Sequence, residues 1–266
     1  MDATTVWGIP GNWAEIYQTC FVPTIIAPWV ERTLALAAPR AGERLLDVAC
    51  GTGAVTLPAA QRVGPTGQVI GLDPSPEALA VARSQNGQKG GAAIGWRDGV
   101  AESLPFADGS FDVVTCQFGA MFFPDRMAAL CEIRRVLAPG GRLALTTWGP
   151  LDQNLGNAAM AQAWQERVSS EHAAKLKPPH SLSDPAELRG LLAAAGFAQI
   201  DVQRQSGRAR FSSPQELVCG YGALSGLAAD AALRDALCAD VARLLEAYCG
   251  PEGVDYPTEG VLAQAS

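Results

Sequence analysis

Two apolar runs at a fixed spacing constrain the fold of this 266-residue chain more than any other feature. The first, residues 45–50, ends in the turn Gly51-Thr52-Gly53. The second, residues 69–72, ends in Asp73, twenty residues after Gly53. Such runs predict buried parallel strands, and glycines without a β-carbon let a ligand approach the backbone where a strand turns into a helix. The pattern therefore predicts a nucleoside-cofactor site at the carboxyl ends of parallel strands.

A nicotinamide-dinucleotide enzyme is the first alternative, because its fingerprint also follows a strand. That fingerprint would place a third glycine at position 56, where this chain has Thr56. An acid at strand spacing fits both kinds of cofactor. Residues further along the chain are needed to separate them.

The segment after the third predicted strand separates the two cofactors. Asp98-Gly99-Val100-Ala101-Glu102-Ser103-Leu104-Pro105-Phe106, followed by Asp108-Gly109-Ser110-Phe111-Asp112-Val113-Val114, resembles the adenine-binding loop and fourth strand of class I S-adenosylmethionine-dependent methyltransferases. Arg134-Arg135-Val136-Leu137-Ala138-Pro139-Gly140-Gly141 resembles the helix and turn before the next strand of that family. The resemblance covers roughly residues 38–149 in order. Within the family, the chain is most similar to the ubiquinone/menaquinone C-methyltransferase-like group of small-molecule enzymes.

The order of apolar runs predicts alternating strands and helices between residues 44 and 148, which indicates a parallel sheet covered on both faces. We expect strands at 44–49, 68–73, 93–98, 111–118 and 142–148, and helices at 54–63, 76–85 and 125–137. The resemblance implies an α/β fold: a Rossmann-like, seven-stranded, mostly parallel sheet with helices on both faces and an inserted helical cap. Its sixth strand and its antiparallel seventh strand are expected at about 199–205 and 259–265.

The expected organisation alternates core and cap. It comprises an N-terminal helical lid (1–37), the cofactor-binding core (38–149), a cap insertion (150–181), a core helix and sixth strand (182–206), a second cap insertion (207–257) and the last core strand (258–266). A single helix is expected over 155–176 in the first insertion.

Three groups around the first turn are expected to hold the amino-acid and ribose parts of S-adenosylmethionine. Gly51 and Gly53 would direct backbone N–H groups at the ligand's carboxylate, because they lie where a helix begins. Asp47 would face the ligand's ammonium. Asp73 would accept hydrogen bonds from both ribose hydroxyls, each worth about 1.5–3 kcal/mol because the acceptor is charged.

The adenine end departs from the family pattern at Val100, where an aspartate usually accepts a bond from the adenine amino group. Ala101 can still offer its backbone N–H, Pro74 can pack on the adenine face, and Glu102 lies in the same loop. We therefore expect an adenine pocket dominated by backbone contacts, in which a water takes the missing one.

Residues after the fourth strand are expected on the reacting side of the cofactor. The resemblance places Gln117 beside the methionine moiety and Tyr17, in the lid, near its carboxylate. The expected acceptor pocket consists of Phe118, Met121 and Phe122, joined by Trp164 and Tyr221 from the cap. Both interpretations stay open for five of these side chains, which ordinary core or lid packing explains equally well: Tyr17, Gln117, Phe118, Met121 and Phe122.

The sequence assigns no catalytic residue. Methyl transfer depends mainly on holding the two reactants in line, and a base is needed only if the acceptor arrives protonated. His172 and His180, the two histidines, are the candidates for such a base and lie in the predicted cap, where a surface position is the commoner explanation for each. The sequence shows no cluster typical of a metal site.

Composition bounds the partners and the location. The formal charge of −7, without a block of lysine and arginine, argues against nucleic acid. Seven cysteines without a C-x-x-C pair indicate reduced thiols and a cytoplasmic protein. The apolar stretch at 21–30 is short and interrupted by Pro23 and Pro28, so we expect neither a signal peptide nor a membrane span. The expected partner is a small-molecule acceptor, and a homo-oligomer stays open.

The favoured function is S-adenosylmethionine-dependent methyl transfer to a carbon, oxygen or nitrogen of an apolar small molecule. Because a fold does not fix a function, two alternatives remain. One is a cyclase or rearrangement enzyme that binds S-adenosylmethionine on the same fold. The other is a non-catalytic cofactor-binding protein.

Overall fold

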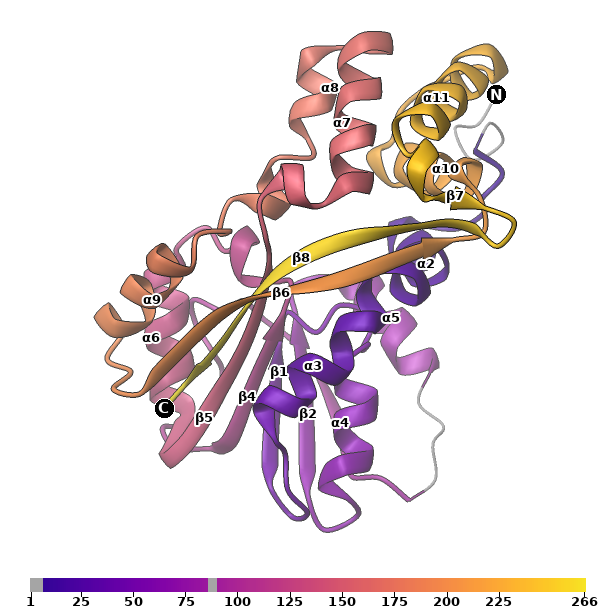
Figure 1. Ribbon diagram of the computed structural model, residues 1–266. Helices are drawn as coiled ribbons and strands as arrows, with labels where there is room; N and C mark the ends of the chain where they lie inside the picture. Colours follow the sequence, from indigo (N-terminus) through magenta and orange to yellow (C-terminus); the bar gives the residue numbers. More distant parts are fainter. Residues whose placement is uncertain (1–6, 86–89) are drawn as a thin grey trace.

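One twisted sheet organises the chain in the computed structural model, which describes residues 7–85 and 90–266 (Figure 1). Residues 1–6 of the predicted lid therefore lie outside the described residues. The strands are β1 (Arg44–Val48), β2 (Gln68–Asp73), β3 (Ala93–Asp98), β4 (Phe111–Gln117), β5 (Leu137–Trp148), β6 (Ile200–Phe211), β7 (Cys249–Gly250) and β8 (Gly253–Ala265). Their order is β3-β2-β1-β4-β5-β8-β6, with β7 paired to β8. Strands β1 to β5 pair in parallel, and β8 runs antiparallel to both β5 and β6. The predicted α/β fold is confirmed.

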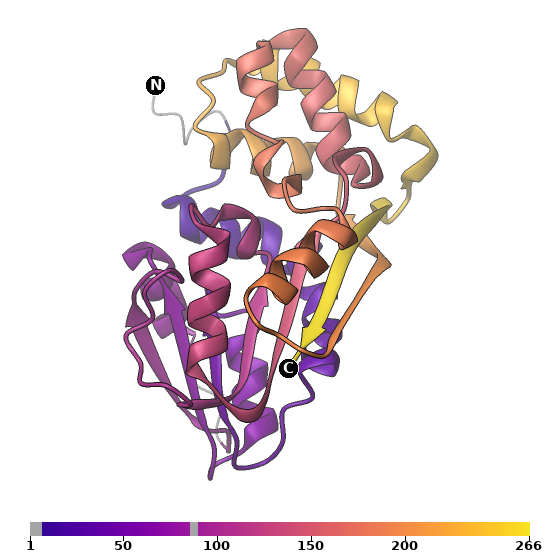
Figure 2. The same cartoon turned by 90° about the vertical axis from the view of Figure 1, so that its left-hand side faces the viewer.

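Helices cover both faces of the sheet and form a cap beyond its carboxyl edge (Figure 2). They are α2 (Trp13–Ile16), α3 (Ala27–Ala37), α4 (Thr56–Val63), α5 (Pro76–Ser84), α6 (Arg126–Val136), α7 (Leu155–Arg167), α8 (Ser170–Ala174), α9 (Pro185–Ala194), α10 (Pro214–Ser225) and α11 (Ala231–Leu244), with the π-helix η1 (Tyr17–Ile26) and the 3-10 turns η2 (Ala120–Phe122), η3 (Leu151–Gln153), η4 (Pro178–His180) and η5 (Glu246–Tyr248).

Alternating side chains divide the core into two layers. Leu45, Val69 and Val113 pack with α3 and α4 on one face of the sheet. The next residues along the same strands, among them Leu46 and Val114, pack with α6 and α9 on the other face. Because both faces are buried, the central strands are continuously apolar. That continuity explains why the predicted strand 68–73 coincides with β2; the predicted strand 93–98 also coincides with β3, the partly exposed strand at the edge of the sheet.

The two last strands of the sheet are longer than predicted. β6 continues to Phe211 and β8 begins at Gly253, whereas the prediction ended the sixth strand at 205 and began the seventh at 259. Half of the extra length of β6 is exposed, polar and arginine-rich, which hid its pairing from a hydrophobicity pattern. The predicted boundaries at 206/207 and 257/258 therefore cut through paired strands, and the second cap insertion spans residues 212–252.

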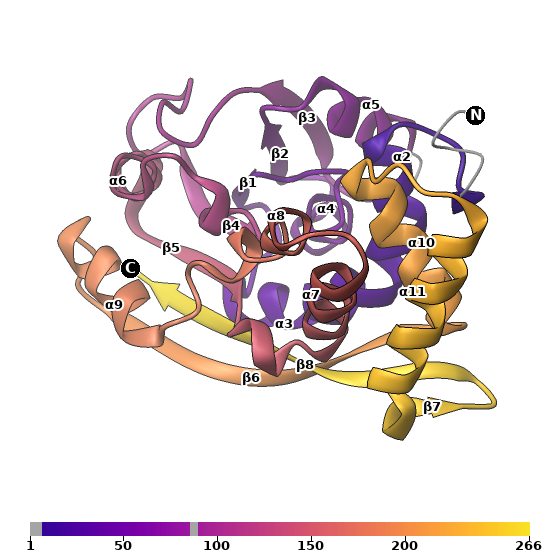
Figure 3. The ribbon, with the colours of Figure 1, turned by 90° about the horizontal axis from the view of Figure 1, so that it is seen from above.

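The predicted helix at 155–176 is two helices. α7 ends at Arg167 and α8 begins after Ser169, whose hydroxyl accepts a hydrogen bond from the backbone N–H of His172. Such a cap satisfies one of the free donors of the new helix. The ion pair between Arg167 Nε and Asp240 Oδ2, at 2.7 Å, joins α7 to α11 of the other insertion. Figure 3 shows both insertions above the carboxyl end of the sheet.

The predicted lid divides into two parts with different roles. α3 packs on β4 and β5 and belongs to the sheet's own layers, whereas α2 and η1 lie at the carboxyl edge of the sheet. The expectation that Pro23 and Pro28 interrupt this stretch is wrong. The Thr24 hydroxyl donates to the Cys20 carbonyl inside the π-wound turn, and helical backbone continues from η1 through Pro28 into α3.

Continuous helix over Trp13–Ala37 makes this segment long and apolar enough for a membrane span by length and composition alone. In the described part of the chain it is the one stretch that meets this test, and 56% of its apolar window is buried inside the fold. Its apolar residues pack against the sheet and the cap.

Close packing of Trp29 against Gly260 generates a prediction for stability. Trp29 is fully buried, and a β-carbon on Gly260 would lie 2.7 Å from its ring. We expect Gly260→Ala to lower the free energy of unfolding by about 1–3 kcal/mol, because a well-packed core resists overfilling. Urea unfolding measures the change.

Gly190→Ala is the matched control. Gly190 lies inside α9, and a β-carbon there would meet nothing within 4 Å. Alanine in a helix interior should stabilise the protein by about 0.5–1 kcal/mol. Equal effects of the two substitutions would contradict the packing argument.

Candidate active site

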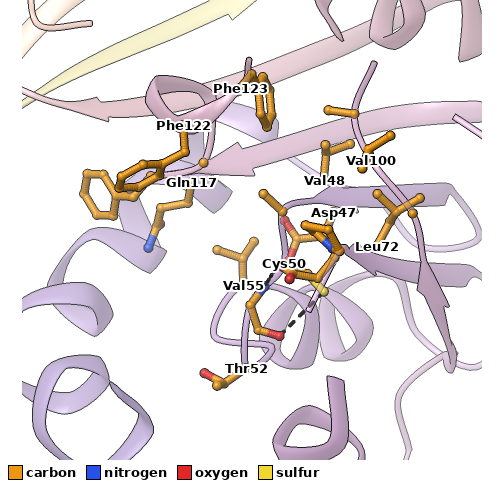
Figure 4. A pocket seen from close by; sticks show the side chains of 18 of the residues that line it. Asp47, Val48, Cys50, Thr52, Val55, Leu72, Val100, Gln117, Phe122 and Phe123 are labelled. Carbon is orange, nitrogen blue, oxygen red and sulfur yellow. Dashed lines mark hydrogen bonds between the residues drawn. The ribbon is translucent and has the colours of Figure 1, made fainter. Parts of the chain in front are cut away.

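A cavity of about 530 Å³, here called the first cavity, lies at the carboxyl ends of β1, β2 and β4 (Figure 4). Its position is set by the strand order, because β1 has β2 on one side and β4 on the other. The connections after β1 and β4 therefore diverge, which opens a crevice in sheets of this kind. α2 and η1 contribute Trp13 and Tyr17 to the wall.

Asp73 ends β2 as a nearly buried carboxylate, 8% exposed, in the wall of the first cavity. Its Oδ2 accepts the backbone N–H of Gly51 at 2.8 Å, and its Oδ1 accepts that of Ser75 at 2.9 Å. Burial raises the pKa of Asp73, and the two backbone bonds oppose that rise. A carboxylate oxygen has two lone pairs, so each oxygen keeps one acceptor site for a ligand hydroxyl.

Asp47 lies on the adjacent strand β1, in the same wall, and is 1% exposed. Its Oδ2 accepts the Thr56 hydroxyl at 2.6 Å and its Oδ1 accepts the Thr115 hydroxyl at 2.8 Å. Burial raises the pKa of Asp47 to about 6, and the two threonine bonds oppose that rise. The carboxylate thus joins the start of α4 to β4, and it is positioned to meet a cationic group of a ligand.

The two glycines of the turn do different work from the one predicted. Gly51 has a φ of +53°, and its N–H donates to Asp73, so the turn fixes the acid. The Gly53 N–H donates to the Cys50 carbonyl at 2.9 Å, and a β-carbon on Gly53 would lie 2.9 Å from the Trp96 ring. Gly53 does not line the first cavity. Both N–H groups therefore have protein partners and are not left for a ligand's carboxylate.

The residues predicted for adenine lie together at one end of the first cavity: Pro74, Val100, Ala101 and Glu102. Val100 is 46% exposed, whereas Ala101 is buried. Trp13, Val100 and Phe122 are the exposed large apolar side chains of the described residues, and all three line this cavity. A planar ligand would cover apolar surface that otherwise faces water.

Tyr17 and Gln117 lie on the side of the first cavity next to the lid. Burial and the neighbouring Asp73 carboxylate raise the pKa of Tyr17. Gln117 Nε2 donates to the Ile26 carbonyl, and its Oε1 accepts the Thr33 hydroxyl at 2.6 Å. Figure 4 shows this side chain directed away from Asp47. Gln117 thus fastens β4 to the N-terminal helices.

A second cavity, of about 420 Å³, lies between the sheet and the cap. It shares four wall residues with the first cavity, namely Tyr17, Ile26, Phe118 and Phe122. Trp164 and Tyr221, predicted for the acceptor, line it as well. Phe118 has a φ of +55°, and its ring stacks on Trp148 with centroids 3.7 Å apart. The two cavities meet across an aromatic wall.

Besides Gly53, three predicted site residues lie in the lining of neither cavity. Met121 is buried, and its carbonyl accepts bonds from Arg126 and Ser181. His172 packs edge-on against Trp164 and contacts Ser225 Oγ at 3.2 Å. His180 is buried behind the second cavity. The expectation of surface histidines is therefore wrong for His180.

Other wall residues gave no sequence signal. Trp13 lies thirty-eight residues before Gly51, and only the folding of α2 brings it to the first cavity. Asn157, Lys175 and Ser225 supply polar groups to the second cavity. Asn157 is a buried polar residue inside an otherwise small and apolar helix face, and that local mismatch is the signal that could have indicated it.

Comparisons with known proteins agree with this geometry. A family model described as "Methyltransferase domain" matches residues 46–145. Nocamycin O-methyltransferase from Saccharothrix syringae is 34% identical over 264 residues, and the match covers 92% of each chain. Demethylmenaquinone methyltransferase from Thermus thermophilus is 35% identical over 180 residues, covering 64% of this chain and 81% of that one. The crystal structure of YcgJ from Bacillus subtilis superposes with a TM-score of 0.60 at 24% identity, covering 89% of this chain and 96% of that one.

The residues of the first cavity fit S-adenosylmethionine. Asp73 keeps acceptor sites for ribose hydroxyls, and Asp47 offers a buried negative charge to an ammonium. The apolar rim suits the flat adenine. Val100 provides no acceptor for the adenine amino group, so that contact falls to the backbone or to water.

Asp73 generates a binding prediction. We expect Asp73→Ala to weaken the binding of S-adenosylhomocysteine at least ~10-fold, because both ribose acceptors and the anchor of Gly51 are lost. Titration calorimetry measures the dissociation constant. Asp98→Ala is the control, because Asp98 is the register partner of Asp73 on β3 but does not line the cavity. Equal losses in both variants would show that general charge, not the ribose contact, is responsible.

Asp47 generates a prediction for the pH dependence of stability. A buried acid whose pKa rises on folding stabilises the protein below its unfolded pKa of about 4, and loses that contribution as the pH rises through about 6. Asp47→Asn removes the loss. The difference in the free energy of unfolding, variant minus wild type, should therefore increase by about 2–3 kcal/mol between pH 4 and pH 7. Urea unfolding at each pH measures this, with the exposed Asp201→Asn as control. A difference that does not change with pH would contradict the buried charge.

Proposed function

Because this chain belongs to the class I S-adenosylmethionine-dependent methyltransferases, we propose that it methylates an oxygen of an apolar small molecule bound in the second cavity. The observation that carries the proposal is the wall shared by the two cavities. A cofactor in the first cavity and an acceptor in the second would meet at Tyr17, Phe118 and Phe122.

The lining of the second cavity supports an apolar acceptor with ring character. Phe21, Trp148 and Trp164 contribute aromatic surface, and Ile25 and Leu224 contribute aliphatic surface. Lys175 is the charged side chain in this lining and is itself exposed, its Nζ donating to the Ser225 carbonyl. Pockets that bind drug-sized ligands have this composition: largely apolar walls with few polar groups.

Oxygen is favoured over carbon by the extent of the sequence matches. The relative whose name describes an O-methyltransferase aligns over 92% of this chain, which includes cap residues. The match to the demethylmenaquinone enzyme covers 64%. Because the cap builds most of the second cavity, similarity that extends into the cap bears more directly on the acceptor.

The chain's part in the reaction is to orient the two reactants and exclude water. S-adenosylmethionine, when bound, would supply a methyl group attached to a positively charged sulfur, and the carbon of that methyl group is electrophilic without further activation. Asp73 and Asp47 would hold its ribose and ammonium, and the shared aromatic wall would fix the line of approach. Orientation of this kind can lower a barrier by about 7–11 kcal/mol. His172 and His180 line neither cavity, and we assign neither as a base.

We further propose a cytoplasmic location and a small-molecule partner in place of nucleic acid. All seven cysteines are free, and Cys131 and Cys249 are exposed, which suits a reducing compartment. The net charge of −7 opposes binding to polyanions.

The acceptor class is tested by incubating the protein with S-adenosylmethionine and four kinds of acceptor: hydroxylated polycyclic aromatics, the corresponding quinols, primary amines and transfer RNA. We expect S-adenosylhomocysteine release with the hydroxylated aromatics, and a mass increase of one methyl group on oxygen. Methylation of transfer RNA alone would overturn the proposal.

Leu224 provides a matched pair of variants. Leu224→Trp should fill part of the second cavity and lower kcat/KM for the acceptor at least ~10-fold, because the larger side chain occupies space that the acceptor needs. Leu224→Met conserves the volume and should change it little. Both should bind S-adenosylhomocysteine as wild type does. An unchanged kcat/KM in Leu224→Trp would place the acceptor elsewhere.

A further inference from the structure

A row of hydrogen bonds runs through the wall of the second cavity. His180 Nδ1 lies 2.7 Å from the Gly149 carbonyl, and His180 Nε2 lies 2.9 Å from Asn157 Nδ2. The Tyr221 hydroxyl is bonded to Asn157 Oδ1. Tyr221 and Asn157 both line the cavity, whereas His180 lies behind them. The row therefore ends at a residue that lines the cavity proposed for the acceptor.

The Gly149 carbonyl sets the direction of every bond in this row. A carbonyl only accepts, so the proton of a neutral His180 is on Nδ1 and Nε2 carries a lone pair. That lone pair needs a donor, which is the Asn157 amide nitrogen. Asn157 Oδ1 is then an acceptor, and Tyr221 must donate its hydroxyl proton to it.

Burial keeps the row in this state. Asn157, His180 and Tyr221 are each less than 9% exposed. Burial lowers the pKa of His180, so the ring is neutral at pH 7. Burial also raises the pKa of Tyr221, so the phenol keeps the proton that it donates.

Tyr221 is left with unused acceptor capacity. Its oxygen has two lone pairs, and no group in the described part of the chain donates to it. The neighbouring polar group of the lining, Ser225 Oγ, already donates to the Gly222 carbonyl and accepts the Leu227 N–H. Tyr221 is therefore a buried acceptor that this wall offers to a ligand.

We propose that Tyr221 selects acceptors that carry a hydroxyl or N–H donor directed at its oxygen, and that Asn157 and His180 act as positioning residues by committing its proton elsewhere. The proposal rests on the proposed function, since it assigns the second cavity to the acceptor. It excludes the reverse arrangement, in which Tyr221 donates to a carbonyl or ether. A ligand without a donor would leave the tyrosine oxygen unpaired in a buried wall, which costs binding energy.

The test compares 2-naphthol, which has a donor, with 2-methoxynaphthalene, which has only an acceptor. Both are titrated at pH 7 into the full-length protein saturated with S-adenosylhomocysteine. We expect 2-naphthol to bind about 10-fold more tightly, the effect of one hydrogen bond. In Tyr221→Phe, which keeps the ring contacts with Phe21 and Trp164, the two ligands should bind within about twofold of each other.

Two Asn157 variants test the direction of the row. Asn157→Asp still offers an acceptor to the Tyr221 proton and should retain the preference for 2-naphthol. Asn157→Leu frees that proton, lets Tyr221 donate to the ether, and should abolish the preference. Unchanged S-adenosylhomocysteine affinity and thermal unfolding establish that each variant is folded.

The outcomes separate this inference from the proposed function. Equal binding of the two ligands to wild type, or a preference that survives in Tyr221→Phe, overturns the role of Tyr221 and leaves the acceptor cavity in place. Failure of both ligands to bind, or binding that Leu224→Trp does not reduce, removes the second cavity as the acceptor site and this inference with it.

Discussion

The reversal of strand order at β1 is the constraint on which the rest of the structure depends. Because β2 and β4 flank β1, the connections that follow β1 and β4 leave the sheet in opposite directions. Asp47 lies where these connections diverge. Burying a carboxylate there is costly, and the bonds from Thr56 and Thr115 offset part of that cost. The same bonds hold the start of α4 against β4. The charge that we propose for cofactor binding thus also fixes the geometry of the crevice.

The two halves of the active site are assembled by different means. The first cavity comes mainly from loops that follow consecutive strands, so local turns position Asp73 and its partners. The second cavity collects Phe21, Trp148, Asn157 and Tyr221 from four separate elements. The paired strands β6 and β8 run from the sheet into the cap and carry these elements together (Figure 1).

The sequence predicted what short segments determine. Apolar runs and turns located the strands, and Asp73 and Asp47 follow from their position in a strand end. Tertiary contacts decided the rest: Gly51 gives its N–H to Asp73, and Met121 faces the core. His180 was a candidate base, but its role depends on Asn157, which lies twenty-three residues away. No local pattern indicates that these two side chains meet.

The winding of η1 has a consequence for how the lid is aimed. An α-helix turns by about 100° per residue, and a π-helix turns by less. The number of residues in η1 therefore determines the direction in which Trp13 and Tyr17 point around the helix axis. α3 gives the reference, because it is packed on the sheet. Inserting or deleting one residue between Tyr17 and Ile26 would swing both side chains around the helix axis and away from the crevice. The length of η1 thus determines which side chains of the lid cover the first cavity.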